Sequence, residues 1–375
     1  MSSAHPDRPP SRQRVAFVVT SLHGGGAEAV GIAWMRWFVE AGHEVSALMV
    51  SDKPVSDLVP AAVTVHRLGR IHGHGGKVRA LRRLFRGERY DAVVALQTYP
   101  NLLAIAARGR SVASPTLVVT EHNLISLGLP GSSRSHRLKI WLAKRWYRRA
   151  DAVTSASHPV GAEMAAAFHV PPSRSLVVPN PALAKVTDRT PVARVPGTAA
   201  GIQLVLACRL VQQKSPHLAL HTAHALRARG IPTEVVSFGG GPLEADLVAL
   251  AERLDVPFTP HGWVEDWFEH FAENSVVILP SHREGLGNVL VEAAARGVPS
   301  VAVSTALGVA DAIIPGVTGE LSLDDDPASI ADAVEAAAGL DVRDIDAWLE
   351  RFSADSSGAL LERTIDYARV ARAAR

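Results

Sequence analysis

The sequence predicts an α/β protein built from two doubly wound halves, each with its own parallel sheet. Its 375 residues are enough for two domains of roughly 100–200 residues. Short apolar runs typical of buried strands alternate with stretches of helical spacing, and this alternation stops and restarts once. An aperiodic segment at 183–200 separates the two series and is expected to be a linker. Strands that alternate with helices require crossover connections, which favour parallel sheets.

The first half, residues 14–182, begins after a polar, proline-rich segment at 1–13 that we expect to be a disordered lead-in. Its predicted strands are 15–20, 43–50, 63–68, 91–96, 116–120 and 151–157. Its predicted helices are 27–41, 77–87, 99–108 and 134–149.

The second half, residues 201–355, repeats the same pattern, and residues 356–375 are expected to form a final helix. Its predicted strands are 202–208, 233–239, 256–258, 275–280 and 300–303. Its predicted helices are 215–229, 242–254, 287–296 and 327–338. Ligands of such sheets bind at the carboxyl ends of the strands, so we expect the site to lie there.

Composition indicates a globular protein of the cytoplasm. Hydrophobic residues make up 47% and charged residues 20% of the chain, and no apolar run approaches the ~20 residues that span a bilayer. The single cysteine, Cys208, excludes an intrachain disulfide and a cysteine-based zinc site. It follows an apolar run and is expected to be a buried thiol.

Charge is divided unequally between the halves. Residues 1–182 hold 23 Lys and Arg against 11 Asp and Glu, whereas residues 183–375 hold 16 against 26. The basic half indicates an anionic partner, or else the two halves carry surfaces of opposite sign. Residues 77–89 and 134–149 are basic and amphipathic, and 77–89 is the candidate for peripheral contact with the inner membrane face. The alternative is a helix with a core face and a charged outer face. No nucleic-acid partner is expected, because no fold for one is recognised.

A glycine-rich loop follows the first strand. Gly24, Gly25 and Gly26 can turn backbone amides toward an anion at the start of the next helix. The alternative is a tight turn that needs glycine for positive φ. The sequence continues Ala27-Glu28-Ala29, which departs from the G-x-G-x-x-G pattern of a dinucleotide site.

Polar residues also follow the strands elsewhere. His122 comes directly after strand 116–120, where it is either an active-site group or an ordinary loop histidine. Arg209 and Lys214 flank the turn after strand 202–208, and two cations there suit a diphosphate. Glu284 lies in the loop before a helix that starts near Gly287, and Glu292 lies within that helix. These carboxylates can accept hydrogen bonds from sugar and ribose hydroxyls, or they are helix-start and helix-surface charges.

In this order, the motifs resemble those of the retaining glycosyltransferases of family 4, over about residues 14–370. The resemblance depends on the glycine loop with Glu28, His122, Arg209 with Lys214, and Glu284-x7-Glu292. It is extended by the segments VVPNP (177–181), GGGP (239–242) and HGW (261–263). The family implies the GT-B fold: two Rossmann-like domains that face a central cleft, with a C-terminal helix that crosses back to the first domain.

The resemblance implies that the two domains bind different substrates. The first domain would bind the acceptor and the second the nucleotide sugar, with Arg209 and Lys214 on the diphosphate. The implied catalytic residues are His122, Arg209, Lys214 and Glu284. The implied donor-binding residues are Gly25, Gly26, Gly240, Gly241, Pro242, Gly285, Leu286, Gly287, Asn288, Val289 and Glu292, and segment 304–311 would complete the phosphate wall. The implied acceptor-binding residues are His23, Gly24, Glu28 and Asn123.

Two positions depart from the family. Leu286-Gly287 stands where an aromatic residue is usual, which bears on donor identity, and Pro181 follows Asn180 where glycine or valine is usual. The resemblance implies transfer with retention and without a metal or other cofactor. His217, His221 and His224 share one helix face, but a solvated histidine face is favoured over a metal site.

Three functions fit these residues. The first is sugar transfer from a UDP- or GDP-linked donor to a soluble small molecule of specialised metabolism. The second is transfer to a lipid-linked or envelope glycan at the membrane surface. The third is a sugar-nucleotide epimerase of the same fold, and a non-catalytic sensor is disfavoured because the charged site residues are all present.

Overall fold

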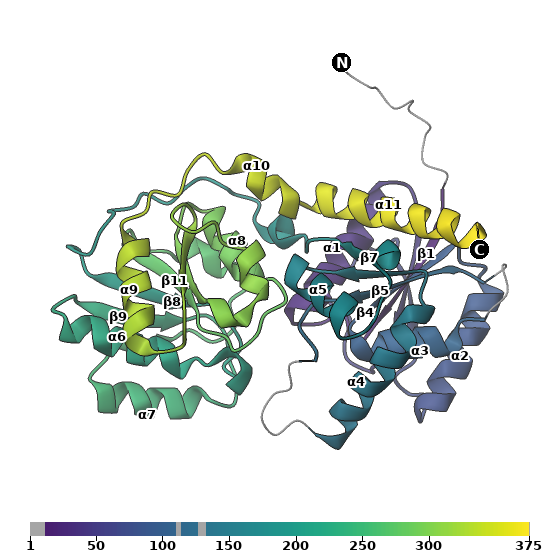
Figure 1. Ribbon diagram of the computed structural model, residues 1–375, viewed down its shortest axis with the longest axis horizontal. Coiled ribbons are helices and arrows are strands. Elements are labelled where there is room, and N and C mark those ends of the chain that lie inside the picture. The colour runs from purple at the N-terminus through teal and green to yellow at the C-terminus, as the bar shows by residue number, and fades with distance from the viewer. Residues whose placement is uncertain (1–11, 110–113, 127–132, 375) are drawn as a thin grey trace, which may run out of the picture. The chain divides into compact units, whose positions relative to one another are not determined.

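The computed structural model describes residues 12–109, 114–126 and 133–374, and the chain divides into two compact units (Figure 1). Unit 1 holds the chain up to Thr120, then Arg145–Val153 and Glu362–Arg375. Unit 2 holds Glu121–Lys144 and Thr154–Leu361. The lead-in predicted for 1–13 lies, up to residue 11, outside the described residues.

The first sheet has seven strands in the order β3-β2-β1-β4-β5-β6-β7. Its central strand β1 pairs in parallel with β2 and β4, so that Val15 lies beside both Val45 and Ala92. This reversal of strand order on either side of β1 is the doubly wound arrangement. The strands are β1 (Arg14–Val19), β2 (Glu44–Met49), β3 (Thr64–Arg67), β4 (Ala92–Leu96), β5 (Thr116–Glu121), β6 (Ala152–Ser155) and β7 (Ser175–Val177).

Among the described residues, five α-helices connect these strands: α1 (Gly26–Glu40), α2 (His74–Gly87), α3 (Thr98–Ala107), α4 (Arg134–Trp146) and α5 (His158–Ala166). Helix α1 starts directly after the glycine loop, in which Gly24 and Gly25 have φ of 70° and 87°. The loop therefore needs glycine for its backbone conformation at two of its three positions.

The second sheet lies in unit 2 and has six strands in the order β10-β9-β8-β11-β12-β13. Strands β8 and β11 form its centre, and their side chains pack into one core with Ile330 of α9. The strands are β8 (Ile202–Leu206), β9 (Thr233–Ser237), β10 (Phe258–Pro260), β11 (Ser275–Leu279), β12 (Ser300–Val303) and β13 (Gly319–Ser322). The helices are α6 (His217–Ala228), α7 (Glu244–Leu254), α8 (Asn288–Ala294), α9 (Pro327–Ala338), α10 (Asp346–Leu349) and α11 (Ala354–Ala373).

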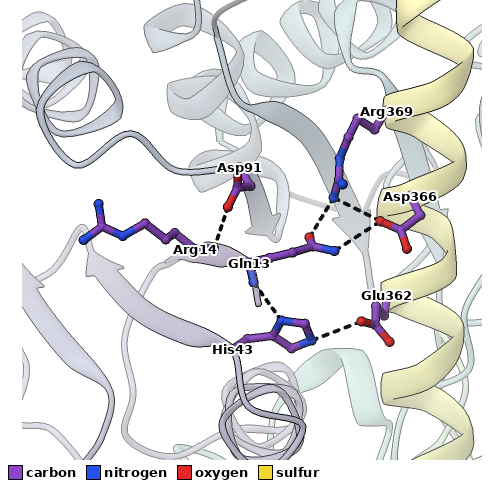
Figure 2. Close-up of polar contacts among 7 residues, drawn as sticks. All are labelled: Gln13, Arg14, His43, Asp91, Glu362, Asp366 and Arg369. Carbon is purple, nitrogen blue, oxygen red and sulfur yellow. Dashed lines mark hydrogen bonds and ion pairs between the residues drawn. The ribbon is translucent and has the colours of Figure 1, made fainter. Parts of the chain in front are cut away.

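The last helix, α11, belongs to unit 1 from Glu362 onward. Figure 2 shows Glu362, Asp366 and Arg369 along one side of α11, facing Gln13 and His43. The Nε2 of His43 lies 3.0 Å from Glu362, and the Gln13 side chain contacts Asp366 and Arg369 at 3.2 and 2.7 Å. The predicted return of the C-terminal helix to the first domain is confirmed by these contacts.

The predicted fold class, two Rossmann-like parallel sheets with connecting helices, is confirmed. Two strands were missed, β7 and β13, because runs of three and four residues in turn-rich sequence give little periodic signal. Strand β10 lies at 258–260 rather than at the predicted 256–258.

Candidate functional site

The centre of the candidate site is the buried carboxylate of Glu284 in unit 2. Its Oε1 accepts hydrogen bonds from the Nζ of Lys214 at 2.5 Å and from the Oγ of Ser281 at 2.6 Å. Among the described residues no hydrogen bond reaches Oε2 of Glu284, so this oxygen can accept one from a ligand. An ionised carboxylate in such surroundings is a strong hydrogen-bond acceptor.

Lys214 is positioned by the turn that follows β8. Its amide donates to the carbonyl of Val211 at 2.9 Å, and the amide of Val211 donates to the carbonyl of Arg209 at 2.9 Å. These two bonds fold residues 209–214 tightly, so both predicted cations belong to one short loop. Arg209 is exposed and forms no ion pair with any described residue, which leaves its guanidinium available to an anion.

The thiol of Cys208 reports how close these charges lie. Burial raises the pKa of Cys208 to about 12, whereas the charges of Lys214 and Arg209 act to lower it and that of Glu284 acts to raise it. All three charged groups therefore surround this one buried side chain. The predicted buried thiol is confirmed, and it lies just beyond the end of β8.

Glycine is required where the loop after β9 approaches this turn. A Cβ on Gly239 would overlap the carbonyl of Cys208, and one on Gly241 would overlap the carbonyl of Leu210. The amide of Leu210 donates to the carbonyl of Gly240 at 3.1 Å, which ties the two segments together. The predicted donor-binding glycines Gly240 and Gly241 thus lie beside the Arg209 loop, followed by the exposed Pro242.

A second close approach brings His122 beside the Glu284 loop. A Cβ on Gly285 would overlap the carbonyl of His122, and one on Gly308 would overlap the carbonyl of Glu284. The amide of Glu284 also donates to the carbonyl of Ala306 at 3.1 Å. Three loops of unit 2 therefore meet backbone to backbone, and the structure brings the predicted catalytic residues His122, Lys214 and Glu284 together.

His122 is held in one orientation by a pair of asparagines. Its Nδ1 lies 2.9 Å from Oδ1 of Asn180, and the Nδ2 of Asn180 donates to Oδ1 of Asn288 at 2.9 Å. Burial lowers the pKa of His122 to about 4, partly opposed by the hydrogen bond to Asn180. The ring is therefore neutral at pH 7 and carries its proton on Nδ1, which makes Nε2 the acceptor nitrogen.

Glu292 is buried on α8, and one of its two carboxylate oxygens is bound by other side chains of the protein. Its Oε2 accepts from Nε1 of Trp267 at 2.8 Å and pairs with Nζ of Lys185 at 2.9 Å. The Lys185 ammonium also lies over the ring of Phe268, 5.4 Å from its centroid. Neither protein contact uses Oε1 of Glu292, so one oxygen can bind a hydroxyl while the other stays fixed.

The remaining predicted residues of unit 2 differ in whether their side chains or only their backbone groups can contact a ligand. Leu286 is buried in the core, so only its backbone can face a ligand, and Gly287 adopts φ 85° to start α8. Val289 packs against the same core. The Oδ1 of Asn123 is buried and, among the described residues, has no hydrogen-bond partner. Such an orphan acceptor is a place where a ligand or water can bind.

The predicted residues His23, Gly24, Gly25, Gly26 and Glu28 lie in unit 1 and form their own small group. Glu28 is in the first turn of α1, and Ser21 Oγ lies 3.2 Å from its Oε1. A Cβ on Gly25 would meet the same carboxylate, whereas one on Gly24 or Gly26 would meet nothing within 4 Å. The glycine loop thus leaves open space beside its outer positions.

The histidines of α6 give no sign of a metal centre. The rings of His217 and His221 lie 6.3 Å apart, and Nδ1 of His224 lies 3.0 Å from the carbonyl of Leu254. Within the part of the chain that the structure describes, no group of three or more His, Cys, Asp or Glu side chains is arranged to hold a metal ion.

Four residues that were not predicted as site residues hold the predicted ones in place: Ser281, Asn180, Lys185 and Trp267. Asn180 lies within the motif VVPNP (177–181) and Ser281 lies three residues before Glu284, so proximity in sequence could have indicated both. Lys185 is the last residue of a 3₁₀ helix at Ala182–Lys185, and Trp267 is the first residue of another at Trp267–Glu269; no sequence pattern links either residue to Glu292. Only the packing of distant segments reveals these contacts.

Comparison with known proteins finds family models that match both parts of the chain. Residues 25–181 match the family model described as a glycosyl transferase 4-like domain, and residues 201–338 match the model of glycosyl transferases group 1. The D-inositol 3-phosphate glycosyltransferase of Geodermatophilus obscurus is 36% identical over 182 residues, which is 44% of this chain and 40% of that protein. The match thus spans less than half the length of that relative.

Solved structures resemble the chain over nearly its whole length. The lipopolysaccharide outer core galactosyltransferase WaaB in its apo form has a TM-score of 0.72 at 18% identity, covering 94% of this chain and 99% of that one. HepE from Anabaena, solved with UDP and glucose, has a TM-score of 0.70 at 17% identity and covers 95% of this chain and all of that one. At these identities the similarity extends to the fold.

Proposed function

Because the chain belongs to the GT-B glycosyltransferase superfamily, we propose that it transfers a sugar from a nucleotide-diphosphate sugar to an acceptor. The observation that carries this proposal is the ion pair between the partly buried Lys214 and the buried carboxylate of Glu284, with Arg209 beside it. A cation that is already paired with a carboxylate, next to a second exposed cation, suits a ligand that combines a sugar with a diphosphate.

Each group has a role in this proposal. Arg209 and Lys214 neutralise the diphosphate, and Oε2 of Glu284 accepts a hydrogen bond from a hydroxyl of the donor sugar. Glu292 binds the ribose hydroxyls through Oε1, while Lys185 and Trp267 hold its other oxygen. His122, whose ring is neutral and is held by Asn180, lies near the donor sugar.

We further propose that transfer retains the anomeric configuration and needs no metal. The bond between the anomeric carbon and the phosphate oxygen breaks, and the acceptor oxygen attacks on the same face. The proton of the acceptor passes to the departing phosphate oxygen, whose negative charge Arg209 and Lys214 stabilise. Activity should then survive EDTA, and the product should show the donor's anomeric configuration by NMR.

The acceptor class remains a choice between two proposals. A soluble small molecule is the first, and the name of the Geodermatophilus relative, which acts on D-inositol 3-phosphate, supports a small polar acceptor. A lipid-linked or envelope glycan is the second. It is favoured by the basic, partly apolar surface of α4, described below.

The test is the release of nucleoside diphosphate from UDP- and GDP-sugars with and without candidate acceptors. Thermal shifts with UDP and GDP would first identify the base, because a bound ligand raises the apparent stability by mass action. Acceptor-dependent release, abolished in Glu284→Gln, would support the proposal. Donor conversion that needs no acceptor would instead support the epimerase, and a structure with sugar nucleotide bound away from Lys214 would contradict the site.

A further inference from the structure

Two helices of this chain are basic and amphipathic, yet they differ in what they expose. On α2, the apolar residues Leu81 and Phe85 are 0% and 6% exposed, so its apolar side faces the core. On α4, Leu138 and Trp141 are 56% and 58% exposed. The sequence singled out 77–89 for membrane contact, but α4 is the helix that shows apolar side chains to solvent.

The exposed residues of α4 lie on one face of the helix. Leu138 and Trp141 are three residues apart, and Arg134, Arg137 and Lys144 each lie three or four residues from one of them. We call these five residues the α4 face, and all five belong to unit 2. Three of the five are cations, and all five are exposed.

No acidic residue balances this charge along the helix. Between positions 133 and 149 the sequence contains seven Arg and Lys and no Asp or Glu. Within the described ranges, Arg134, Arg137 and Lys144 form no ion pair with a carboxylate, and Lys144 lies 5.7 Å from the centroid of the Phe168 ring. A purely solvated face explains the cations but not the exposed Trp141 and Leu138 between them.

We propose that the α4 face binds the surface of an anionic phospholipid membrane. Tryptophan favours the boundary between headgroups and acyl chains, where its ring is apolar and its N–H meets polar groups. Leu138 adds apolar area beside it, and arginine and lysine bind lipid phosphates while their stems lie along the apolar surface. Apolar anchors ringed by cations fit this boundary, whereas a nucleic acid or an acidic peptide offers no acyl layer to Leu138.

The proposal is independent of which sugar is transferred, and it does not depend on the proposed function. It places unit 2 at a membrane through a helix other than the one that sequence favoured. Its consequence for the reaction is that acceptors displayed on an anionic membrane would be concentrated near the enzyme.

The test is flotation of the full-length protein with vesicles of phosphatidylglycerol and of phosphatidylcholine, without donor or acceptor. We expect binding to phosphatidylglycerol vesicles at least tenfold tighter than to phosphatidylcholine vesicles. Leu138→Ser/Trp141→Ser and Arg137→Gln/Lys144→Gln should each weaken binding about tenfold or more. Arg83→Gln/Arg86→Gln on α2 is the matched control, because it removes the same charge from two exposed arginines and should change binding less than twofold.

Unchanged thermal melting of each variant would show that the fold is intact. Equal binding by the Leu138→Ser/Trp141→Ser variant and the wild type would overturn the proposal. An equal loss of vesicle binding in the Arg83→Gln/Arg86→Gln control would also overturn it, because binding would then depend on net charge alone. Binding of a single-stranded oligonucleotide that is lost in the same variants would assign the face to nucleic acid instead. Absence of flotation refutes membrane binding, while release of nucleoside diphosphate with a soluble acceptor tests the enzyme separately.

Discussion

The Nδ1 of His122 donates a hydrogen bond to Oδ1 of Asn180 over 2.9 Å, and this contact decides which ring nitrogen of the neutral histidine carries the proton. The orientation of Asn180 is fixed in turn, because its Nδ2 donates to Asn288. Burial lowers the pKa of His122 to about 4, so the ring is neutral at pH 7. A neutral ring with a defined tautomer can accept a hydrogen bond at Nε2 but cannot supply positive charge to a diphosphate.

This state predicts a pH dependence of stability. In the unfolded chain a histidine titrates near pH 6.5, so between pH 6.5 and 4 the unfolded state binds more protons than the folded state. The free energy of unfolding should therefore fall as pH drops through this window, by on the order of 3 kcal/mol from His122, and no further below pH 4. Urea unfolding of wild type and His122→Gln at pH 7, 5.5 and 4.5 measures it, since the variant lacks this titration. Parallel pH profiles for the two proteins would refute the assignment.

The Lys214–Glu284 pair predicts separate effects on stability and on activity. Lys214→Met leaves a buried carboxylate without its cation and should lower the free energy of unfolding by about 3 kcal/mol. The double variant Lys214→Met/Glu284→Gln removes both charges and should recover most of that loss. Transfer should fall about 100-fold or more in both variants, because the diphosphate loses a stabilising charge.

Urea unfolding and acceptor-dependent release of nucleoside diphosphate separate these two quantities. Recovery of activity in the double variant would mean that the pair serves only the fold. Stability of Lys214→Met equal to that of the wild type would mean that the buried pair is not formed in solution.

The close approach of the Glu284 loop to His122 predicts intolerance of any side chain at Gly285. A Cβ there would overlap the carbonyl of His122, so Gly285→Ala should cost about 1–3 kcal/mol of stability. Gly75 on α2 has nothing within 4 Å of the equivalent position, and Gly75→Ala should leave stability unchanged or raise it by up to about 1 kcal/mol. Thermal melting of the two variants decides this, and equal melting temperatures would show that the loops do not touch as described.

The contact between His43 and Glu362 predicts how firmly α11 is held in unit 1 (Figure 2). The amide of Gln13 donates to Nδ1 of His43 at 3.2 Å, so Nε2 of His43 carries the proton and donates to Glu362. Glu362→Ala removes the acceptor from a fully buried ring and should cost about 1–3 kcal/mol. Arg363→Ala changes an exposed neighbour and serves as control. Urea midpoints that shift equally in the two variants would argue against the contact.

Sequence alone predicted the parts of the site that follow strands. Arg209, Lys214 and Glu284 lie in loops after predicted strands of the second half, and His122 follows a predicted strand of the first half. Ligands of parallel sheets bind at the carboxyl ends of the strands, which is where all four residues lie. Periodicity also predicted most of the strands themselves. Periodicity could not predict Lys185 or Trp267 as supporting residues, because no local pattern relates them to the Glu292 side chain that they hold.

The sequence by itself determined two parallel α/β sheets and the charged residues at their carboxyl ends, because both depend on local periodicity and on residue type. Only the tertiary structure decided which oxygen of each glutamate is engaged, which proton His122 carries and which basic helix exposes its apolar residues. These depend on contacts between segments more than 50 residues apart, such as His122 with Asn180 and Lys214 with Glu284. Burial and hydrogen-bond geometry arise only when those segments pack together.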